Sequence, residues 1–272
     1  MNYYHVPTIL EQASFTHGPR DLFAQYFQLA DETTRDLGVR LRLCWDFDRL
    51  MDLNRQYRDS WPALPPIFDP THNTLGPDIA FWVEGVDEFG HTVVTSAARL
   101  YDHGDKSLAD DLRSLRVFYD DPTPHAEAGD SIDVMAPSAE HIFGRAMYSG
   151  AVWVRPDYRR HGFTRIIPRL TRAYAMTQWN TPVFWMVIAQ DLDKGGVTRA
   201  YGSWHLDGRI AVHLPSLQKH SELLFGLMGQ TTLIRDIASS VYDTAVGTSR
   251  WTETPMMSRS SPLERHGMST RS

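Results

Sequence analysis

The stretch AVWVRPDYRRHGFTRIIPRLT, residues Ala151 to Thr171, is the most informative part of this 272-residue chain. Its apolar start is typical of a strand, which Pro156 ends because proline has no backbone N–H to donate. The basic turn 159–161 then leads to Gly162, and the spacing of apolar residues predicts a helix over 162–178. A turn of this kind exposes backbone N–H groups at the start of a helix, where the helix dipole also favours an anion. The stretch therefore predicts a binding turn for a phosphate or pyrophosphate.

Outward from this turn, the chain alternates between helical and strand-like patterns. Helices are predicted over 21–36, 47–61, 107–118, 162–178, 196–201 and 218–241, the last interrupted near Gly229. Strands are predicted over 39–44, 79–86, 92–101, 148–154, 182–189 and 209–214. Two proline-containing stretches, 62–77 and 120–140, are expected to be irregular. The order favours an α/β fold with a hairpin first and a strand–helix–strand unit later.

The domain organisation is expected to be simple. Residues 1–38 are interpreted as an N-terminal helical extension and residues 39–245 as one domain. Residues 246–272 are rich in Ser, Thr and Arg and have no helical or strand period, so we predict a disordered tail. This tail is either a solvated terminus or a segment that binds a partner or is phosphorylated.

The composition excludes several classes of protein. Apolar residues make up 42% and charged residues 22%, which is ordinary globular usage. The sequence has no run of 18 apolar residues, so no membrane span is predicted. The chain lacks a basic segment followed by an apolar one at its start, so a secretory signal is not expected. Cys44 is the one cysteine and the 12 histidines show no metal-binding spacing, so we expect no disulfide, no metal site and a cytoplasmic protein. The net charge of −6 argues against a nucleic-acid partner.

The run VRPDYRRHGFT, residues 154–164, resembles the acetyl-CoA motif of the GCN5-related N-acetyltransferase superfamily. That motif reads Gln or Arg, two residues, Gly, one residue, then Gly or Ala. Arg159 matches its first position and Gly162 its glycine, while Thr164 stands where Gly or Ala is usual. The resemblance extends over 39–214. The alternative is that the segment is only a basic loop between a strand and a helix.

The resemblance implies a GNAT-like mixed α/β fold with a splayed central sheet and flanking helices. Strand 148–154 would diverge from strand 182–189, and the gap would hold the pantetheine arm of acetyl-CoA or another acyl-CoA. The residues that the resemblance assigns to cofactor binding are Val152, Trp153, Val154, Arg159, Arg160, His161, Gly162, Phe163 and Thr164.

The resemblance also implies direct transfer to an amine, which needs an acid for the leaving thiolate and a base for the incoming ammonium. Tyr201 lies where such proteins often carry the acid, although a packing role is the alternative. Glu84 interrupts an apolar strand and is the candidate base. Glu140, His141 and a water relay are the other candidates for this role.

The implied function is acyl-CoA-dependent N-acylation of a small-molecule or peptide amine, and a homodimer is compatible with it. A second hypothesis starts from the ARLY segment, 98–101, and the long insertion after it, which resemble acyl-homoserine-lactone and N-acyl amino acid synthases. Such an enzyme would use a long acyl-CoA or an acidic acyl carrier protein, which Arg113 and Arg116 could contact. A third hypothesis is a protein that binds CoA without turnover.

Overall fold

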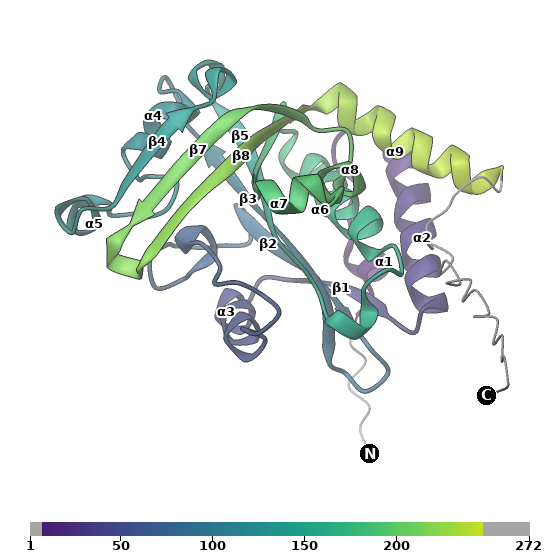
Figure 1. The fold of residues 1–272 in the computed structure, drawn as a ribbon. Helices are drawn as coiled ribbons and strands as arrows, with labels where there is room; N and C mark the ends of the chain where they lie inside the picture. The colour runs from purple at the N-terminus through teal and green to yellow at the C-terminus, as the bar shows by residue number, and fades with distance from the viewer. Residues whose placement is uncertain (1–6, 247–272) are drawn as a thin grey trace, which may run out of the picture.

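The computed structural model describes residues 7–246, which form a central sheet with helices on both of its faces (Figure 1). The strands are β1 (Arg40–Cys44), β2 (Ala80–Val86), β3 (Thr92–Asp102), β4 (Ser131–Met135), β5 (Arg145–Val154), β6 (Val183–Ala189), β7 (His205–Leu214) and β8 (Lys219–Gly229). The helices are α1 (Ile9–Gln12), α2 (Arg20–Asp36), α3 (Phe47–Gln56), α4 (Leu108–Arg113), α5 (Thr123–Glu127), α6 (Phe163–Trp179), α7 (Gln190–Lys194), α8 (Val197–Tyr201) and α9 (Gln230–Ala245). Short 3₁₀ turns are η1 (Pro66–Phe68), η2 (Pro137–His141), η3 (Pro156–Tyr158) and η4 (Pro215–Leu217).

The sheet has eight strands in the order β1-β2-β3-β5-β6-β8-β7-β4. Every neighbouring pair is antiparallel except β5 and β6, which run parallel. A parallel pair needs a long crossover, and α6 provides it between these two strands. The predicted mixed α/β class is therefore confirmed.

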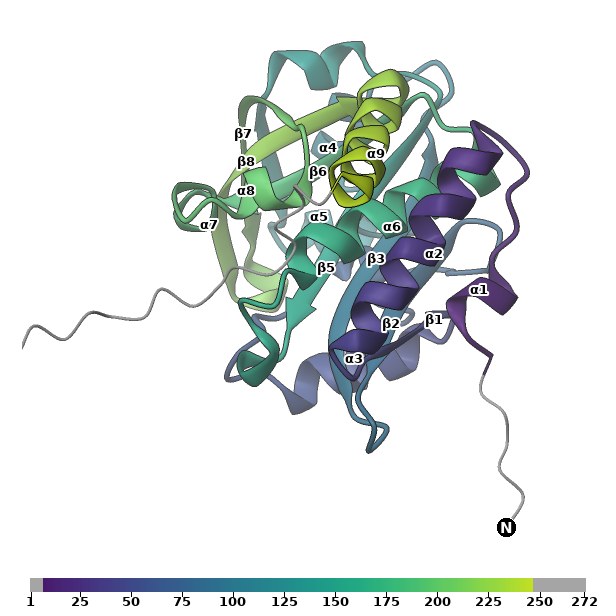
Figure 2. The same ribbon diagram turned by 90° about the vertical axis from the view of Figure 1, so that its right-hand side faces the viewer.

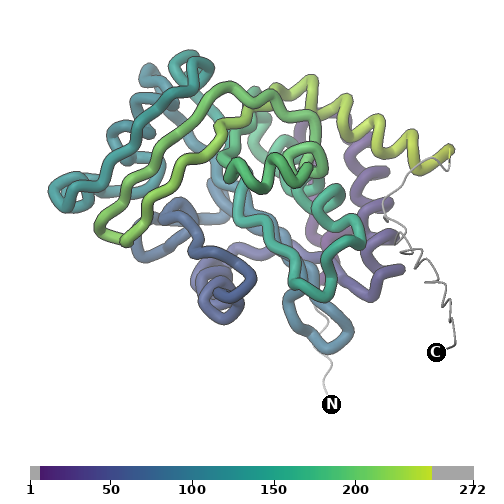
Figure 3. Tube along the Cα trace, in the orientation of Figure 1, coloured from purple at the N-terminus to yellow at the C-terminus, as the bar shows by residue number. Residues whose placement is uncertain are grey.

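The two faces of the sheet carry separate cores. On one face α2, α6 and α9 lie side by side, as the two ribbon views show (Figures 1 and 2). Their apolar side chains, such as Phe23 and Phe27 on α2, are fully buried against the sheet. On the other face the core contains α3, α4 and residues 57–79, which we call the proline-rich loop. The turn between β7 and β8 comes close to this loop in the chain trace (Figure 3).

Two sequence-based assignments are wrong. Residues 219–229 form strand β8 rather than helix, and the helix begins only at Gln230. The run LLFGLMG has no clear period, so neighbouring strands decide its structure. Residues 120–140 contain α5, β4 and η2 rather than only loop, and β4 pairs with the outer edge of β7. The helices predicted over 47–61 and 107–118 exist but end early, at Gln56 and Arg113.

The assignment of residues 1–38 to an extension stays a prediction, although α2 packs within the same core as α6 and α9. The expected tail over 246–272 lies, apart from Val246, outside the described residues. No helix within residues 7–246 is long and apolar enough to cross a membrane.

Candidate active site at the split between β5 and β6

The central strands of the sheet part from each other. β5 and β6 pair over only three residue pairs, from Ala146 with Val183 to Tyr148 with Trp185. β5 nevertheless continues to Val154 along its other neighbour, β3. Beyond Tyr148 the edge of β5 that faces β6 thus lacks a strand partner. The predicted divergence of these two strands is confirmed.

A bulge in β5 accounts for the divergence. The pairing with β3 shifts between Thr95 opposite Trp153 and Ala97 opposite Gly150, so two residues of β5 face one residue of β3. Ala151, in this bulge, has a φ of +51°, and its carbonyl accepts a hydrogen bond from the Thr95 hydroxyl at 2.8 Å. A bulge bends its strand and increases its twist. The bend carries β5 away from β6 at this point.

An apolar cavity of about 240 Å³ lies over the split. Its walls come from β5, β6, the β7–β8 hairpin and the proline-rich loop. Most of the buried side chains in these walls belong to the core on the face of the sheet that the proline-rich loop covers. Its lining contains the polar side chains of Tyr148, Ser149, Tyr201 and Lys219, and also the indole of Trp61. No carboxylate or imidazole lines this cavity in the part of the chain that the structure describes.

A second pocket, the basic pocket of about 520 Å³, lies at the start of α6. Four arginines line it: Arg160, Arg165, Arg169 and Arg199. Gly162 and Thr164 also contribute, and Gly162 has a φ of +84°, a conformation that glycine adopts without steric cost. Both pockets take part of their lining from α8, Ala200 for the basic pocket and Tyr201 for the apolar cavity.

The predicted cofactor-binding residues divide between these surfaces and the core. Val152 lines the apolar cavity, whereas Trp153 and Val154 are buried. Trp153 stacks on Trp61 with ring centroids 5.1 Å apart and donates its indole N–H to the Ser60 hydroxyl at 3.2 Å. These contacts attach the proline-rich loop to the end of β5.

In the basic turn, only some of the predicted residues face the basic pocket. Arg160, Gly162 and Thr164 line it. The Arg159 side chain instead donates to the carbonyl oxygens of Val154 at 3.1 Å and Ser60 at 3.2 Å.

His161, in the turn, and Phe163, the first residue of α6, line neither the apolar cavity nor the basic pocket. His161 is exposed, with its Nδ1 3.2 Å from the Tyr158 carbonyl oxygen. The Phe163 ring is buried in the core beneath α6. Any contact from Phe163 to a ligand in the basic pocket would therefore come from its backbone.

Tyr201 is placed at the apolar cavity by charged residues from the helices behind it. Arg172 donates to the Tyr201 carbonyl oxygen, and Arg169 donates to that of Ala200 at 2.6 Å. Arg169 is itself paired with Asp236 of α9 at 2.8 Å. Burial raises the pKa of Tyr201 above its ordinary value, so the hydroxyl keeps its proton at neutral pH.

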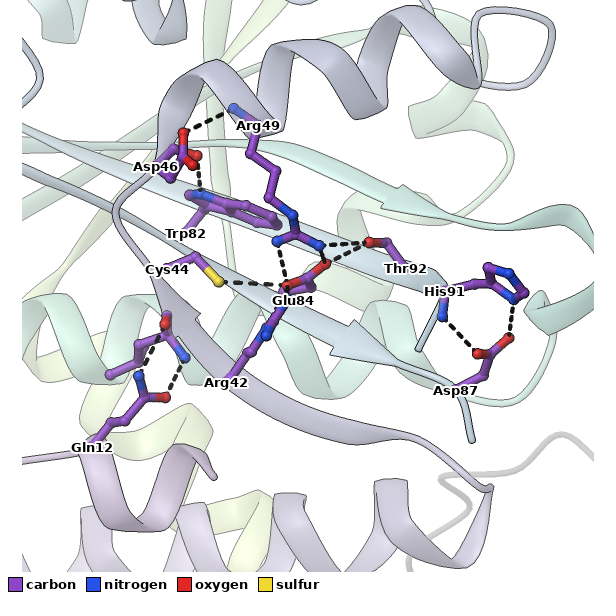
Figure 4. A network of polar contacts seen from close by, with 11 residues as sticks. Gln12, Arg42, Cys44, Asp46, Arg49, Trp82, Glu84, Asp87, His91 and Thr92 are labelled. Carbon is purple, nitrogen blue, oxygen red and sulfur yellow. Dashed lines mark hydrogen bonds and ion pairs between the residues drawn. The ribbon is translucent and has the colours of Figure 1, made fainter. Parts of the chain in front are cut away.

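Glu84 lies elsewhere, within a cluster of polar groups at the β1 side of the sheet (Figure 4). Its fully buried carboxylate accepts hydrogen bonds from Arg42 at 2.6 Å and Arg49 at 2.7 Å, and from Thr92. Burial alone would raise the pKa of Glu84, but the hydrogen bonds from Arg49, Thr92 and Arg42 outweigh burial and hold it below its ordinary value. The structure thus separates the predicted base from the cavity.

Cys44 belongs to the same cluster, with its sulfur 3.5 Å from the Glu84 carboxylate. Burial, and then the neighbouring negative charge, raise the pKa of the Cys44 thiol to about 12. A thiol in this state is a poor nucleophile. The cluster therefore has the properties of a structural ion pair of Glu84 with Arg42 and Arg49, beside which Cys44 is a neutral thiol.

The remaining candidates for the base and for carrier binding also lie away from the cavity. Glu140, on η2, is paired with Arg113 at 3.1 Å, and neither Glu140 nor His141 lines the cavity. Arg116 lies 3.6 Å from the buried Asp111. Since Glu84, Glu140 and His141 all lie outside the cavity lining, a water relay is the candidate base that remains compatible with it.

Sequence reasoning missed Lys219, Arg169 and Arg199. Lys219 was hidden because its segment was predicted to be helical, although it lies at the start of β8 and lines the apolar cavity. Arg169 and Arg199 come to the basic pocket from α6 and α8, and nothing in the local sequence separates them from solvated arginines. Within the described residues, no group of histidine, cysteine and carboxylate side chains could hold a metal ion.

Comparison with known proteins gives structural likenesses only. No family model and no curated protein matches the chain. The chain is similar to the structure of spermidine N-acetyltransferase from Vibrio cholerae in complex with CoA and spermine, with a TM-score of 0.40 and 12% identity, covering 72% of this chain and 98% of that one. It is also similar to Arabidopsis thaliana NAA60 in complex with acetyl-CoA, with a TM-score of 0.44 and 10% identity, covering 71% and 99%. Likenesses of this size carry no argument about activity.

Proposed function

We propose that this protein is an acyl-CoA-dependent N-acyltransferase of the GCN5-related type. The observation that carries the proposal is the split between the parallel strands β5 and β6, with an apolar cavity over it and a basic pocket that shares α8 as a wall with this cavity. A long ligand with an anionic end and an amide-containing arm matches this arrangement.

The residues present fit such a cofactor at both ends. The free edge of β5 beyond Tyr148 offers backbone N–H and C=O groups, which an extended amide-containing arm could pair with as an added strand does. At the other end, the start of α6 and the arginines of the basic pocket provide N–H donors and positive charge for a pyrophosphate. Arg160 is the side chain we assign to that end, because Arg169 is already paired with Asp236.

When bound, an acyl-CoA would supply a thioester whose C–S bond breaks as the acceptor nitrogen bonds to its carbonyl carbon. The backbone N–H groups at the bulge in β5 could then stabilise the oxyanion. Tyr201, with its raised pKa, holds a proton at its hydroxyl for the leaving sulfur. The Ser149 hydroxyl lines the cavity and forms no hydrogen bond to another described residue, so it could hold a water that takes the proton of the acceptor ammonium.

The test is release of free thiol from acetyl-CoA in the presence of a panel of primary amines. We expect thiol release that depends on the amine, with the acylated amine detected by mass spectrometry. Arg160→Ala should raise the Michaelis constant for acetyl-CoA, whereas Arg55→Ala on the exposed side of α3 serves as a matched control and should not. Acetyl-CoA binding without turnover on any amine would instead support the protein that binds CoA without catalysis.

A further inference from the structure

We propose that the acceptor is an amine that carries a carboxylate on an apolar body, as an apolar α-amino acid does, and that Lys219 binds this carboxylate. The inference rests on the proposed function and deepens it by naming a substrate class. It starts from the one cation that lines the apolar cavity among residues 7–246.

Lys219 is held at the cavity by its position in the β7–β8 hairpin. It is the first residue of β8, where it pairs with Leu214, and its side chain is half-buried. Its ammonium donates to the Ala63 carbonyl oxygen of the proline-rich loop at 3.2 Å. An ammonium has three donors, and this is the one hydrogen bond that the Lys219 ammonium makes to another described residue.

The charges around Lys219 favour an anionic ligand. It forms no ion pair with any side chain of residues 7–246, and no carboxylate lines the cavity beside it. Burial and then the positive charge of Arg58 lower the pKa of Lys219, and no negative group offsets them. A partly desolvated cation without a counter-ion is costly, and a carboxylate on the ligand would remove that cost.

The remaining lining selects an apolar body for the ligand. Apart from Lys219, the side chains that the hairpin and the proline-rich loop contribute to the cavity wall are mainly apolar, among them Leu214, Leu223, Trp61 and Leu64. A polyamine would place a second ammonium among these groups with no carboxylate to receive it. The lining therefore disfavours polycationic acceptors and favours an apolar amine with a negative group.

The experiment compares amines with the same aromatic body, with and without a carboxylate. Thiol release is measured with L-phenylalanine, phenethylamine and L-phenylalaninamide, using the wild type, Lys219→Met, Lys219→Arg and the exposed-site control Lys106→Met. We expect kcat/KM for L-phenylalanine, calculated for the unprotonated amine because the three ammonium groups differ in pKa, to exceed that for the other two amines by about tenfold or more, as for a charge-assisted hydrogen bond. Lys219→Met should abolish this preference, Lys219→Arg should retain it in part, and Lys106→Met should not change it.

Binding gives a readout that does not depend on turnover. Calorimetry with L-phenylalanine in the absence of cofactor should show weaker binding to Lys219→Met than to the wild type, while the thermal unfolding midpoint stays the same. An equal or greater efficiency with phenethylamine, or an unchanged preference in Lys219→Met, would overturn the inference and leave the proposed function standing. Failure to bind acetyl-CoA and to release thiol with every amine would instead contradict the proposed function itself.

Discussion

The Glu84 cluster and the apolar cavity are two polar sites on the same sheet with opposite properties. In the cluster, the carboxylate is fully buried and every side chain that reaches it is a donor. In the cavity, the edge of β5 has no strand partner and Lys219 has no counter-ion within the described residues. Saturated polar groups stabilise a fold, whereas unsatisfied ones at a cavity are available to a ligand. The contrast explains why a carboxylate that looks notable in a strand need not be catalytic.

The largest effect should come from breaking the Glu84 cluster. Glu84→Ala leaves Arg42 and Arg49 without their shared partner, and removing one member of a buried pair typically costs about 3–5 kcal/mol. Both arginines are partly exposed, so we expect the lower end, about 3 kcal/mol, in the free energy of unfolding measured with urea. Acetyl-CoA affinity of the folded fraction should not change. A variant of normal stability that has lost turnover would return Glu84 to the mechanism.

Low pH should remove the stability that the Glu84 cluster contributes. The pKa of Glu84 is lowered by folding, so its contribution to stability is complete above the ordinary glutamate value and is lost as the pH falls through the folded value. Urea unfolding of the wild type and Glu84→Gln should therefore converge as the medium becomes acidic. A difference in stability that stays constant down to strongly acidic pH would contradict this linkage.

On the cavity side, Tyr201→Phe should lower kcat by about 10²-fold, because a general acid typically contributes 10² to 10⁴. The ring and its packing remain, so stability and acetyl-CoA affinity should change little. Rapid-quench and steady-state kinetics with one good acceptor measure the effect. An unchanged kcat would assign Tyr201 to packing.

The pH profile tests whether a carboxylate or an imidazole acts as the base. Since no carboxylate or imidazole lines it in the described chain, kcat/KM should rise about tenfold per pH unit until the acceptor ammonium titrates. The raised pKa of Tyr201 keeps the acid protonated over that range. A plateau that begins well below the pKa of the acceptor would reveal a base that the lining does not show.

The smallest effect should come from Ala151→Gly in the bulge of β5. A φ of +51° at alanine costs of order 1 kcal/mol, and glycine removes this strain while adding backbone entropy to the unfolded chain. We expect a change within about 1 kcal/mol in unfolding free energy and little change in cofactor affinity.

By contrast, Gly150→Ala would place a Cβ 2.7 Å from the Tyr148 ring and should disturb the cavity wall.

Local signals were sufficient for the motif turn but not for the sheet edges. Gly162 and the apolar periods around it predicted β5, α6 and β6, because each depends on residues close in sequence, whereas their divergence was implied by the resemblance of the motif. β4 and β8 were missed because pairing with β7 determines them. For the site, the sequence predicted Arg160, Gly162 and Tyr201, which line the two pockets, and Glu84, which lines neither of them. Lys219 could not be found, since its role depends on a hairpin folding over the proline-rich loop.

The most direct test of the central claim is a calorimetric titration of the full chain with acetyl-CoA. If the split and the basic pocket form the cofactor site, the wild type should saturate with one molecule per chain, and Arg160→Ala should bind about tenfold more weakly. The control Arg55→Ala should bind like the wild type. Absence of binding up to millimolar acetyl-CoA, or an affinity that Arg160→Ala leaves unchanged, would contradict the claim.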